Sequence, residues 1–453
     1  MEETSIEELE KTQIQFTCSI CGRELGIEEV YMIPDSKFAV DSENQDNCGQ
    51  KLIFALLCKE CLEEKHKGIN GQIPNARSYR LVERKLPIHL VVQLLEKNIM
   101  DVPLGQPSFA DSRYTSYPLN TDDFHPLPKL TRERKIAFVD GGSAEIIGAP
   151  NFAVGLTRLY FVVFKGDQRI EPVELPQMIE FYVICFARTR SNQIVYKTLL
   201  VPVKEEWVKY LPDVSDLEFN SFDQTLMSGG QRVIVSRILD VTRTFSEWRF
   251  SKFVIESELD RGDILVRDGS LQTTVTNESK YSNDAYEAAL KKGIFFTALS
   301  KTSTLFTDSG LPLFPSIQIL SETSALKDLA WYYFPIVDIN HADHRAEMFA
   351  VKLHRNSDYV FRFEVLKDQV SKKNMGEAEL IFSALAENSI DLGFPGYPYG
   401  LIDADRFARI SMNEKAANEF QFRAALSSQK QTWDKISKFV RASDAHEILN
   451  KLR

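Results

Sequence analysis

The sequence predicts an α/β protein in which a mixed sheet is flanked by helices, with a small separate module before it. Two apolar stretches, Lys135–Val139 and Ile264–Val266, each lead to an Asp followed by Gly, which predicts buried strands ending at acidic residues. Three β-rich segments follow the first stretch, and a long amphipathic helical pattern precedes the second. Together these patterns predict one α/β core with acidic side chains at the ends of its strands.

Length and composition indicate an ordinary globular protein with two or three domains. The chain has 453 residues, of which 43% are hydrophobic and 26% charged. It begins with an acidic stretch and has no apolar run long enough to cross a bilayer, so we expect a cytoplasmic protein without a membrane partner. The net charge of −10 opposes binding to nucleic acid through bulk electrostatics.

Cysteines gather near the N-terminus, where they form two CxxC pairs. In a cytoplasmic chain such pairs indicate a metal site rather than disulfides, and four thiolates suit tetrahedral zinc. Zinc would also fold a segment too small for its own core, here residues 1–75. The predicted ligands of this structural Zn²⁺ are Cys18, Cys21, Cys58 and Cys61. Cys48 is a spare thiol or alternative ligand, and Cys185 reads as a small core residue.

The zinc module resembles HNH endonuclease domains in its run Leu57–Leu62, which is followed by His66. The catalytic histidines of that family would fall near Tyr31 and Met32, so the resemblance implies a degenerate, treble-clef-like zinc scaffold without HNH chemistry. After it, residues 76–130 are predicted to be a linker with one short helix, Leu90–Lys97. The Pro-, Ser- and Asp-rich sequence from Pro103 to Pro128 is typical of a connector on the surface.

The largest predicted domain covers residues 131–412, with helices over 413–453 packed on it or extending it. After Asp140-Gly141-Gly142, its predicted strands are Leu156–Lys165, Ile179–Arg188, Val195–Val203, Phe295–Lys301, Leu329–Val337, Phe349–Leu353 and Tyr359–Val365. Its predicted helices are 231–259, Asp284–Lys292, Glu377–Asn388 and one that carries Asp405 after a proline-rich turn. Over 413–453 the predicted apolar side consists of Trp433, Ile436, Phe439 and Val440.

Four acidic residues lie on different predicted elements of this domain. Asp140 follows a strand, Glu247 lies on the long helix, Asp268 ends the next central strand and Asp405 lies on a late helix. This order resembles the RNase H-like nuclease fold, in which three or four carboxylates hold two divalent ions. Carboxylate oxygen is the preferred ligand of Mg²⁺ and Mn²⁺, so the resemblance implies a two-metal-ion phosphodiesterase.

Five short motifs resemble one family in particular, the NurA nucleases, which work with the hexameric HerA translocase on DNA ends. They are Phe138–Gly142, Arg243–Glu247, Leu265–Leu271, Leu299–Thr302 and Tyr397–Arg406, in the family's order. The resemblance implies a DNA nuclease that processes ends exonucleolytically, in DNA repair or anti-phage defence. It also implies a homodimer and a HerA-like ATPase as partner, which would remove the need for strong DNA capture by this acidic chain.

The same resemblance implies roles for individual residues. Asp140, Glu247 and Asp268 are the implied ligands of Mn²⁺ or Mg²⁺, and Asp405 takes a position where some members carry His. Lys301 is implied to contact phosphate or to stabilise charge in the transition state. The residues predicted to contact substrate are Gly141, Gly142, Arg267, Tyr397 and Arg406. Asp263 remains a further candidate, whereas His341, His344 and His354 are predicted to be surface or strand residues outside the site.

Two other classes of function remain open on the sequence. An ATP-binding protein of the actin and sugar-kinase type shares the RNase H-like topology and uses Asp-Gly turns around phosphate, but the second half of this chain does not repeat the first. A non-catalytic docking subunit would combine the zinc module with a decayed nuclease fold. All four acidic positions are still acidic, which argues against decay.

Overall fold

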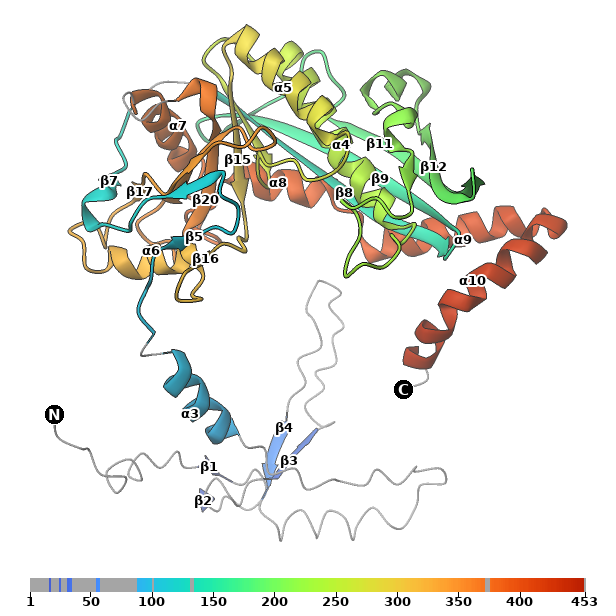
Figure 1. Ribbon diagram of the computed structural model, residues 1–453, viewed down its shortest axis with the longest axis horizontal. Coiled ribbons are helices and arrows are strands. Elements are labelled where there is room, and N and C mark those ends of the chain that lie inside the picture. Colours follow the sequence, from blue (N-terminus) through green and yellow to red (C-terminus); the bar gives the residue numbers. More distant parts are fainter. Residues whose placement is uncertain are drawn as a thin grey trace. The chain divides into compact units, whose positions relative to one another are not determined.

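The computed structural model divides the chain into two compact units, Met1–Asp101 and Val102–Arg453 (Figure 1). It describes residues 102–130, 134–370 and 375–451, together with a helix and four short strands in the first unit. In that unit β1 (Phe16–Thr17) pairs with β2 (Glu24–Leu25), β3 (Tyr31–Pro34) pairs with β4 (Phe54–Leu57), and α3 covers Ile88–Ile99. The four cysteines predicted to bind zinc, and His66, lie outside the described residues.

A large mixed sheet forms the centre of the second unit. Three antiparallel strands, β8 (Lys135–Ala149), β9 (Phe152–Lys165) and β11 (Met178–Arg190), stand in the order β11-β9-β8. Next to β8 come β14 (Ile264–Asp268) and β15 (Phe295–Ser300), both parallel to it. The α/β class with a mixed sheet flanked by helices is therefore confirmed.

The sheet extends beyond this core at both edges. On the β15 side it continues antiparallel through β20 (Phe361–Leu366), β19 (Ala346–Lys352), β17 (Trp331–Tyr333) and β7 (Phe124–Pro126). On the β11 side it continues through β12 (Gln193–Pro202) and β13 (Phe219–Asn220), and β10 (Gln168–Ile170) pairs with the end of β9.

Helices cover both faces of the central strands because alternate side chains of β8 point to opposite sides. Ala137 and Val139 pack in a core with α4 (Arg237–Glu258) and α5 (Glu278–Lys292), which lie side by side in Figure 1. Ile136 and Phe138 pack in a second core with α7 (Gly376–Glu387) and α8 (Tyr399–Ala408). Burial on both faces explains why the central strands read as continuous apolar runs.

The C-terminal segment forms two helices, α9 (Met412–Ser427) and α10 (Lys430–Lys451). Ser411 and Glu414 form a capping box that starts α9. Trp433, Ile436 and Val440 of α10 pack with apolar side chains of β8 and β9, as their spacing predicted. Phe439 is 49% exposed, so its predicted place on the buried side is wrong.

Several elements differ from their predicted extent. β8 does not end at Asp140 but continues to Ala149, so Gly141-Gly142 is strand rather than turn. Parts of the predicted connector are strands of the second unit: β5 (Pro107–Ser108) pairs with β16 (Phe306–Thr307), and β6 (Tyr114–Ser116) pairs with β18 (Val337–Ile339). The long helix α4 begins at Arg237 rather than 231, and α6 (Leu313–Ser321) was not predicted.

No helix among the described residues has the length and apolar character that a membrane span requires.

Candidate metal centre

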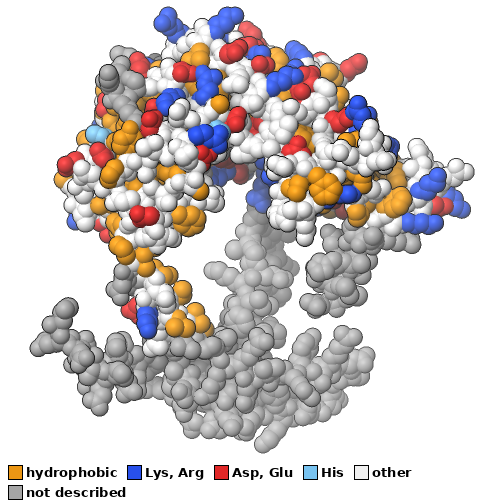
Figure 2. Space-filling model, in the orientation of Figure 1, with side chains coloured by type: hydrophobic (Ala, Val, Ile, Leu, Met, Phe, Trp, Pro, Cys, Tyr) orange, Lys and Arg blue, Asp and Glu red, His pale blue; other side chains and the backbone are white. Residues whose placement is uncertain are grey.

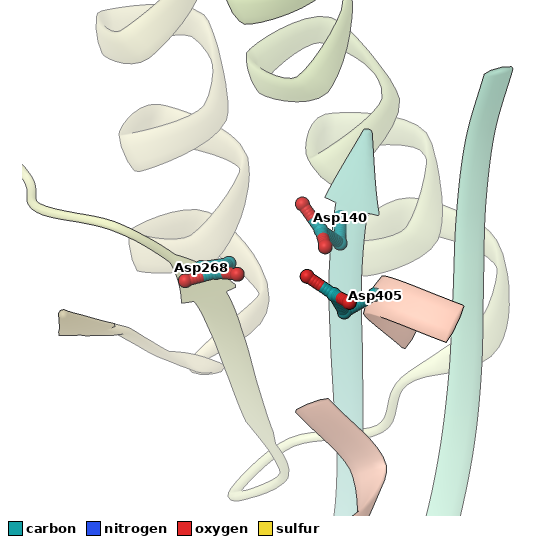
Figure 3. Close-up of side chains that lie close together, drawn as sticks. All are labelled: Asp140, Asp268 and Asp405. Atoms are coloured by element: carbon teal, nitrogen blue, oxygen red, sulfur yellow. The ribbon is translucent and has the colours of Figure 1, made fainter. Parts of the chain in front are cut away.

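Three aspartates from separate elements meet at the centre of the sheet. Asp140 lies within β8, Asp268 ends β14, and Asp405 lies in the last turn but one of α8. Each offers one carboxylate oxygen, and these three oxygens all lie within 4.8 Å of one another. Figure 3 shows Asp140 and Asp268 reaching from neighbouring strands, with Asp405 extending from the helix toward them.

Strand register explains why the first two aspartates come together. β8 and β14 are parallel neighbours, with Val139 paired to Arg267, so the next residue along each strand is the aspartate. Parallel strands carry side chains at the same height on one face, which places the two carboxylates beside each other. The sequence predicts this meeting correctly, although it takes Asp140 for a strand end.

Glycines allow α8 to bring Asp405 to the same place. A Cβ on Gly142 would lie 2.1 Å from the Ala408 carbonyl oxygen, and a Cβ on Gly400 would lie 2.0 Å from the Phe138 ring. Contacts this short are impossible for real side chains, so α8 packs against β8 only because both positions lack a Cβ. For Gly142 this is a packing role, and it differs from the predicted substrate contact.

Lys301, directly after β15, joins two of the clustered aspartates. Its ammonium nitrogen lies 2.7 Å from Asp268 Oδ2 and 2.6 Å from Asp405 Oδ1. Burial opposes a charge on Lys301, but the two carboxylates outweigh that effect and raise its pKa. The lysine predicted to act at the site therefore lies within it.

The cluster holds more negative charge than its surroundings neutralise. Asp140 is 8% exposed, and burial, followed by the charges of Asp268 and Glu247, raises its pKa to about 8. Gly141 N–H donates a hydrogen bond of 2.7 Å to Asp140 Oδ1. Carboxylates this close together repel one another, and a divalent cation such as Mg²⁺ or Mn²⁺, which prefers hard oxygen ligands, would relieve that repulsion.

Tyr397 is the buried side chain that approaches this cluster without a partner. It is 2% exposed, and its hydroxyl has no hydrogen-bond partner among the described residues. Burial raises its pKa, and the charges of Asp268, Asp140 and Asp405 raise it further, which places the phenol near all three. The ring stacks on Phe394, with centroids 5.1 Å apart. The ring is thus covered by protein and is not exposed for stacking on nucleic-acid bases.

Glu247 does not join the three aspartates in this structure. It is 3% exposed, and each of its oxygens contacts a guanidinium group: Oε1 contacts Arg243 and Oε2 lies 2.9 Å from Arg267. It lies close behind the cluster, since a Cβ on Gly141 would be 2.7 Å from Glu247 Oε1. Of the residues predicted to bind metal, the structure groups Asp140, Asp268 and Asp405 and leaves Glu247 paired with arginines.

The two arginines predicted to contact substrate lie in different surroundings. Arg267 is 7% exposed; it donates to the Ser270 carbonyl and to Glu247, and it lies over the Trp248 ring. A guanidinium buried in this way is not placed to contact a phosphate, so its predicted role is corrected to that of a support for Glu247. Arg406, in contrast, is exposed on α8, one residue after Asp405.

Other buried titratable groups of the second unit are structural. Asp263 is buried at the opposite end of β14, where its carboxylate accepts hydrogen bonds from the backbone N–H groups of Lys135 and Asp260. Glu258 accepts bonds from the backbone of residues 173–175. Cys185 is buried and free, as predicted.

A buried polar network that contacts the segment following Asp268 was not predicted from the sequence. Glu364 Oε2 accepts a 2.7 Å bond from Leu271 N–H, while Oε1 contacts Arg362 and lies 3.0 Å from His344 Nε2. His344 Nδ1 bonds in turn to the Tyr114 hydroxyl at 3.0 Å. His344 is therefore buried rather than on the surface. The one signal for this network is an acid within an apolar strand sequence, and nothing in the sequence shows which residues it contacts.

The chain matches a known protein family and several solved structures. The family model described as "NurA domain" matches residues 134–410, which is more than half of the chain. No curated protein matches. Among solved structures, the NurA nuclease from Sulfolobus solfataricus is 13% identical, with a TM-score of 0.40 over 77% of this chain and 96% of that one. The catalytic domain of human Endonuclease V is 11% identical, with a TM-score of 0.30 over 76% of this chain and 98% of that one. The residues matched by the family model include all three clustered aspartates, Lys301 and Tyr397, and the chain belongs to the NurA family.

Proposed function

We propose that this chain is a divalent-metal-dependent DNA nuclease that hydrolyses phosphodiester bonds. The observation that carries the proposal is the convergence of Asp140, Asp268 and Asp405 on one small space. Membership of the NurA family supports the nuclease class over an ATP-binding protein of the actin type. The retained carboxylates support an active enzyme over a docking subunit.

The residues present fit a catalytic Mg²⁺ or Mn²⁺. Its ligands would be the carboxylates of Asp140, Asp268 and Asp405, which supply the hard oxygen donors that these ions require. When bound, the ion would lower the pKa of a water and offset charge on the phosphate. The family resemblance implies two such ions, and the three aspartates supply ligands for the first of them.

The remaining residues of the site have roles that follow from their positions. The Lys301 ammonium faces the same space as the aspartates and would offset negative charge on the transferred phosphoryl group. The unpartnered Tyr397 hydroxyl would donate a hydrogen bond to a phosphate oxygen or a water held there. Arg243, which is paired with Glu247, donates a hydrogen bond to the Gly141 carbonyl and would thereby help to hold the neighbouring Asp140 in place.

Surface charge bears on how DNA reaches the site. The net charge is −10, and Figure 2 shows Lys and Arg side chains interspersed with acidic ones over the face in view rather than gathered in one broad basic field. Counterion release requires clustered cations, so the isolated chain should bind DNA weakly. We therefore propose that a HerA-like hexameric ATPase feeds DNA ends to a homodimer of this chain, which digests them exonucleolytically in repair or anti-phage defence.

Degradation of end-labelled DNA by the full chain in Mn²⁺ tests this proposal. Hydrolysis that needs Mn²⁺, stops with chelator and proceeds without ATP is the expected outcome, and addition of a HerA-like ATPase with ATP should accelerate it. The matched pair of variants is Asp140→Asn, which removes a proposed ligand, and Asp260→Asn, which alters an exposed acid paired with Lys135. ATP binding without any DNA hydrolysis would favour the actin-type alternative, and neither activity would favour a docking subunit.

A further inference from the structure

The ammonium group of Lys301 already pairs with two of the three clustered carboxylates. It lies 2.7 Å from Asp268 Oδ2 and 2.6 Å from Asp405 Oδ1, and so bridges two of the three clustered carboxylates. An ammonium at these distances makes charge-assisted hydrogen bonds to both acids. Those two oxygens are therefore already paired with a positive charge supplied by the chain.

The remaining carboxylate oxygens suffice for one ion. Asp140 Oδ1 accepts the Gly141 N–H, and Asp268 Oδ2 and Asp405 Oδ1 face Lys301. Each aspartate thus keeps one oxygen outside these contacts. Mg²⁺ binds six oxygens, of which several are waters or substrate oxygens, so three carboxylate oxygens are a full protein share for one ion.

The remaining predicted metal ligand, Glu247, is engaged elsewhere. Glu247 contacts Arg243 through Oε1 and Arg267 through Oε2, and it is 3% exposed. Separating a buried carboxylate from one of two guanidinium partners is strongly unfavourable, because it leaves a charge unpaired. No other His, Cys, Asp or Glu in the described part of the chain joins the group of three.

The balance of charge in the cluster also indicates a single ion. Metal binding requires all three carboxylates to be ionised, and together with one ammonium they carry a net charge of −2, which one divalent cation neutralises. A second divalent cation would add two positive charges to this centre, with no carboxylate left to offset them. We infer that this centre holds one divalent cation, and that Lys301 supplies the positive charge that a second ion would supply in a two-metal site. The inference rests on the proposed function and changes its expected number of ions.

Counting bound Mn²⁺ by electron paramagnetic resonance tests the inference without turnover. Titration of the full chain with Mn²⁺ gives the bound ions from the loss of the free-ion signal, and ions that disappear in Asp140→Asn belong to this centre. We expect one such ion per chain in the wild type. Lys301→Met, which removes the charge but keeps an unbranched side chain, is expected to bind two, and Lys301→Arg to bind one.

A second lysine provides the matched control. Lys280 also bridges two aspartates, with its ammonium 3.1 Å from Asp213 and 2.7 Å from Asp216, but those acids lie outside the cluster. Lys280→Met should therefore leave the count at one. Two Asp140-dependent ions in the wild type, or one ion in both the wild type and Lys301→Met, would overturn the inference and leave the nuclease proposal standing. The absence of any Asp140-dependent ion in the wild type would overturn both.

Discussion

Tyr397 combines two properties that seldom occur together in a purely structural residue. Its ring is packed among Phe394 and Phe361, while its buried hydroxyl has no partner among the described residues. An unpaired buried hydroxyl is destabilising, because it loses its bonds to water and gains none in return. A ligand could supply the missing partner, and the acids whose charges act on this phenol are those of the proposed metal centre.

Replacement of Tyr397 by Phe separates function from stability. We expect kcat for DNA hydrolysis to fall about 10²-fold, the usual effect of removing one donor to the transition state. The free energy of unfolding should stay the same or rise slightly, because the substitution removes an unpaired polar group. Urea denaturation and steady-state kinetics on the same preparation measure both quantities.

Tyr332→Phe is the control for this prediction. Tyr332 is also buried, but its hydroxyl donates to Glu379 at 3.0 Å, away from the site. Its replacement should lower the free energy of unfolding by about 1 kcal/mol and leave kcat unchanged. A Tyr397→Phe variant that behaves like this control would contradict the proposed role of the hydroxyl.

At the scale of elements, the fit of α8 against β8 positions Asp405. Gly400 is in the first turn of α8, where alanine would ordinarily favour the helix. A Cβ there would lie 2.0 Å from the buried Phe138 ring, which has little room to move. We expect Gly400→Ala to destabilise the protein by about 1–3 kcal/mol, as overpacking does, and to lower nuclease activity by displacing Asp405.

Gly393→Ala serves as the comparison for that variant. The nearest atom to a Cβ at Gly393 is the side-chain oxygen of Asp391, at 3.1 Å, which can move aside. This variant should keep wild-type activity. Full activity in Gly400→Ala as well would show that the contact between α8 and β8 does not position the site.

The buried network of Glu364 connects β20 with the segment that follows Asp268. Burial raises the pKa of Glu364, but Arg362 and His344 lower it by more, so the net shift is below the ordinary value of 4.5. A carboxyl with a lowered pKa stabilises the fold at pH values above that ordinary value and loses this contribution as the pH falls through the folded-state pKa. Glu364→Gln should therefore reduce the free energy of unfolding at pH 7 by several kcal/mol.

Measurement across pH distinguishes this electrostatic effect from simple loss of packing. The difference in the free energy of unfolding between wild type and Glu364→Gln should shrink as the pH falls below 4.5, where the wild-type carboxylate begins to lose its stabilising contribution. Urea denaturation at each pH gives the difference directly. A difference that persists unchanged at the lowest pH would mean that the charge of Glu364 is not what stabilises the network.

How much the sequence predicts depends on whether the signal is local. The strand Ile264–Asp268 was predictable because an apolar run, an acid and a Gly-Ser turn follow one another. Asp140 was predictable as a site residue but not as a mid-strand residue. Its Gly-Gly pair resembles a turn and in fact makes room for α8 and Glu247, which are far away in the sequence. Arg267 likewise read as a phosphate contact, because its burial against Glu247 and Trp248 depends on tertiary packing.

At the scale of the whole molecule, the division into two units separates the predicted zinc module from the nuclease domain. We expect the full chain to contain about one equivalent of zinc, bound through Cys18, Cys21, Cys58 and Cys61. Metal analysis of the purified protein checks the amount, and a Cys58→Ser variant should lose the zinc. Because the three clustered aspartates all belong to the second unit, DNA hydrolysis should largely survive in that variant. Its complete loss in a folded Cys58→Ser protein would mean that the module takes part in catalysis or substrate binding.

The central claim is that the three aspartates hold the metal with which this NurA-family chain hydrolyses DNA. Its most direct test is the rate of Mn²⁺-dependent DNA hydrolysis by Asp268→Asn, compared with wild type and with Asp284→Asn, a half-exposed acid on α5 that pairs with Lys252. Loss of a metal ligand removes several kcal/mol of transition-state stabilisation, so Asp268→Asn should be at least about 10³-fold slower while unfolding like the wild type. Asp284→Asn should match the wild type. A folded Asp268→Asn protein that hydrolyses DNA at the wild-type rate would contradict the claim.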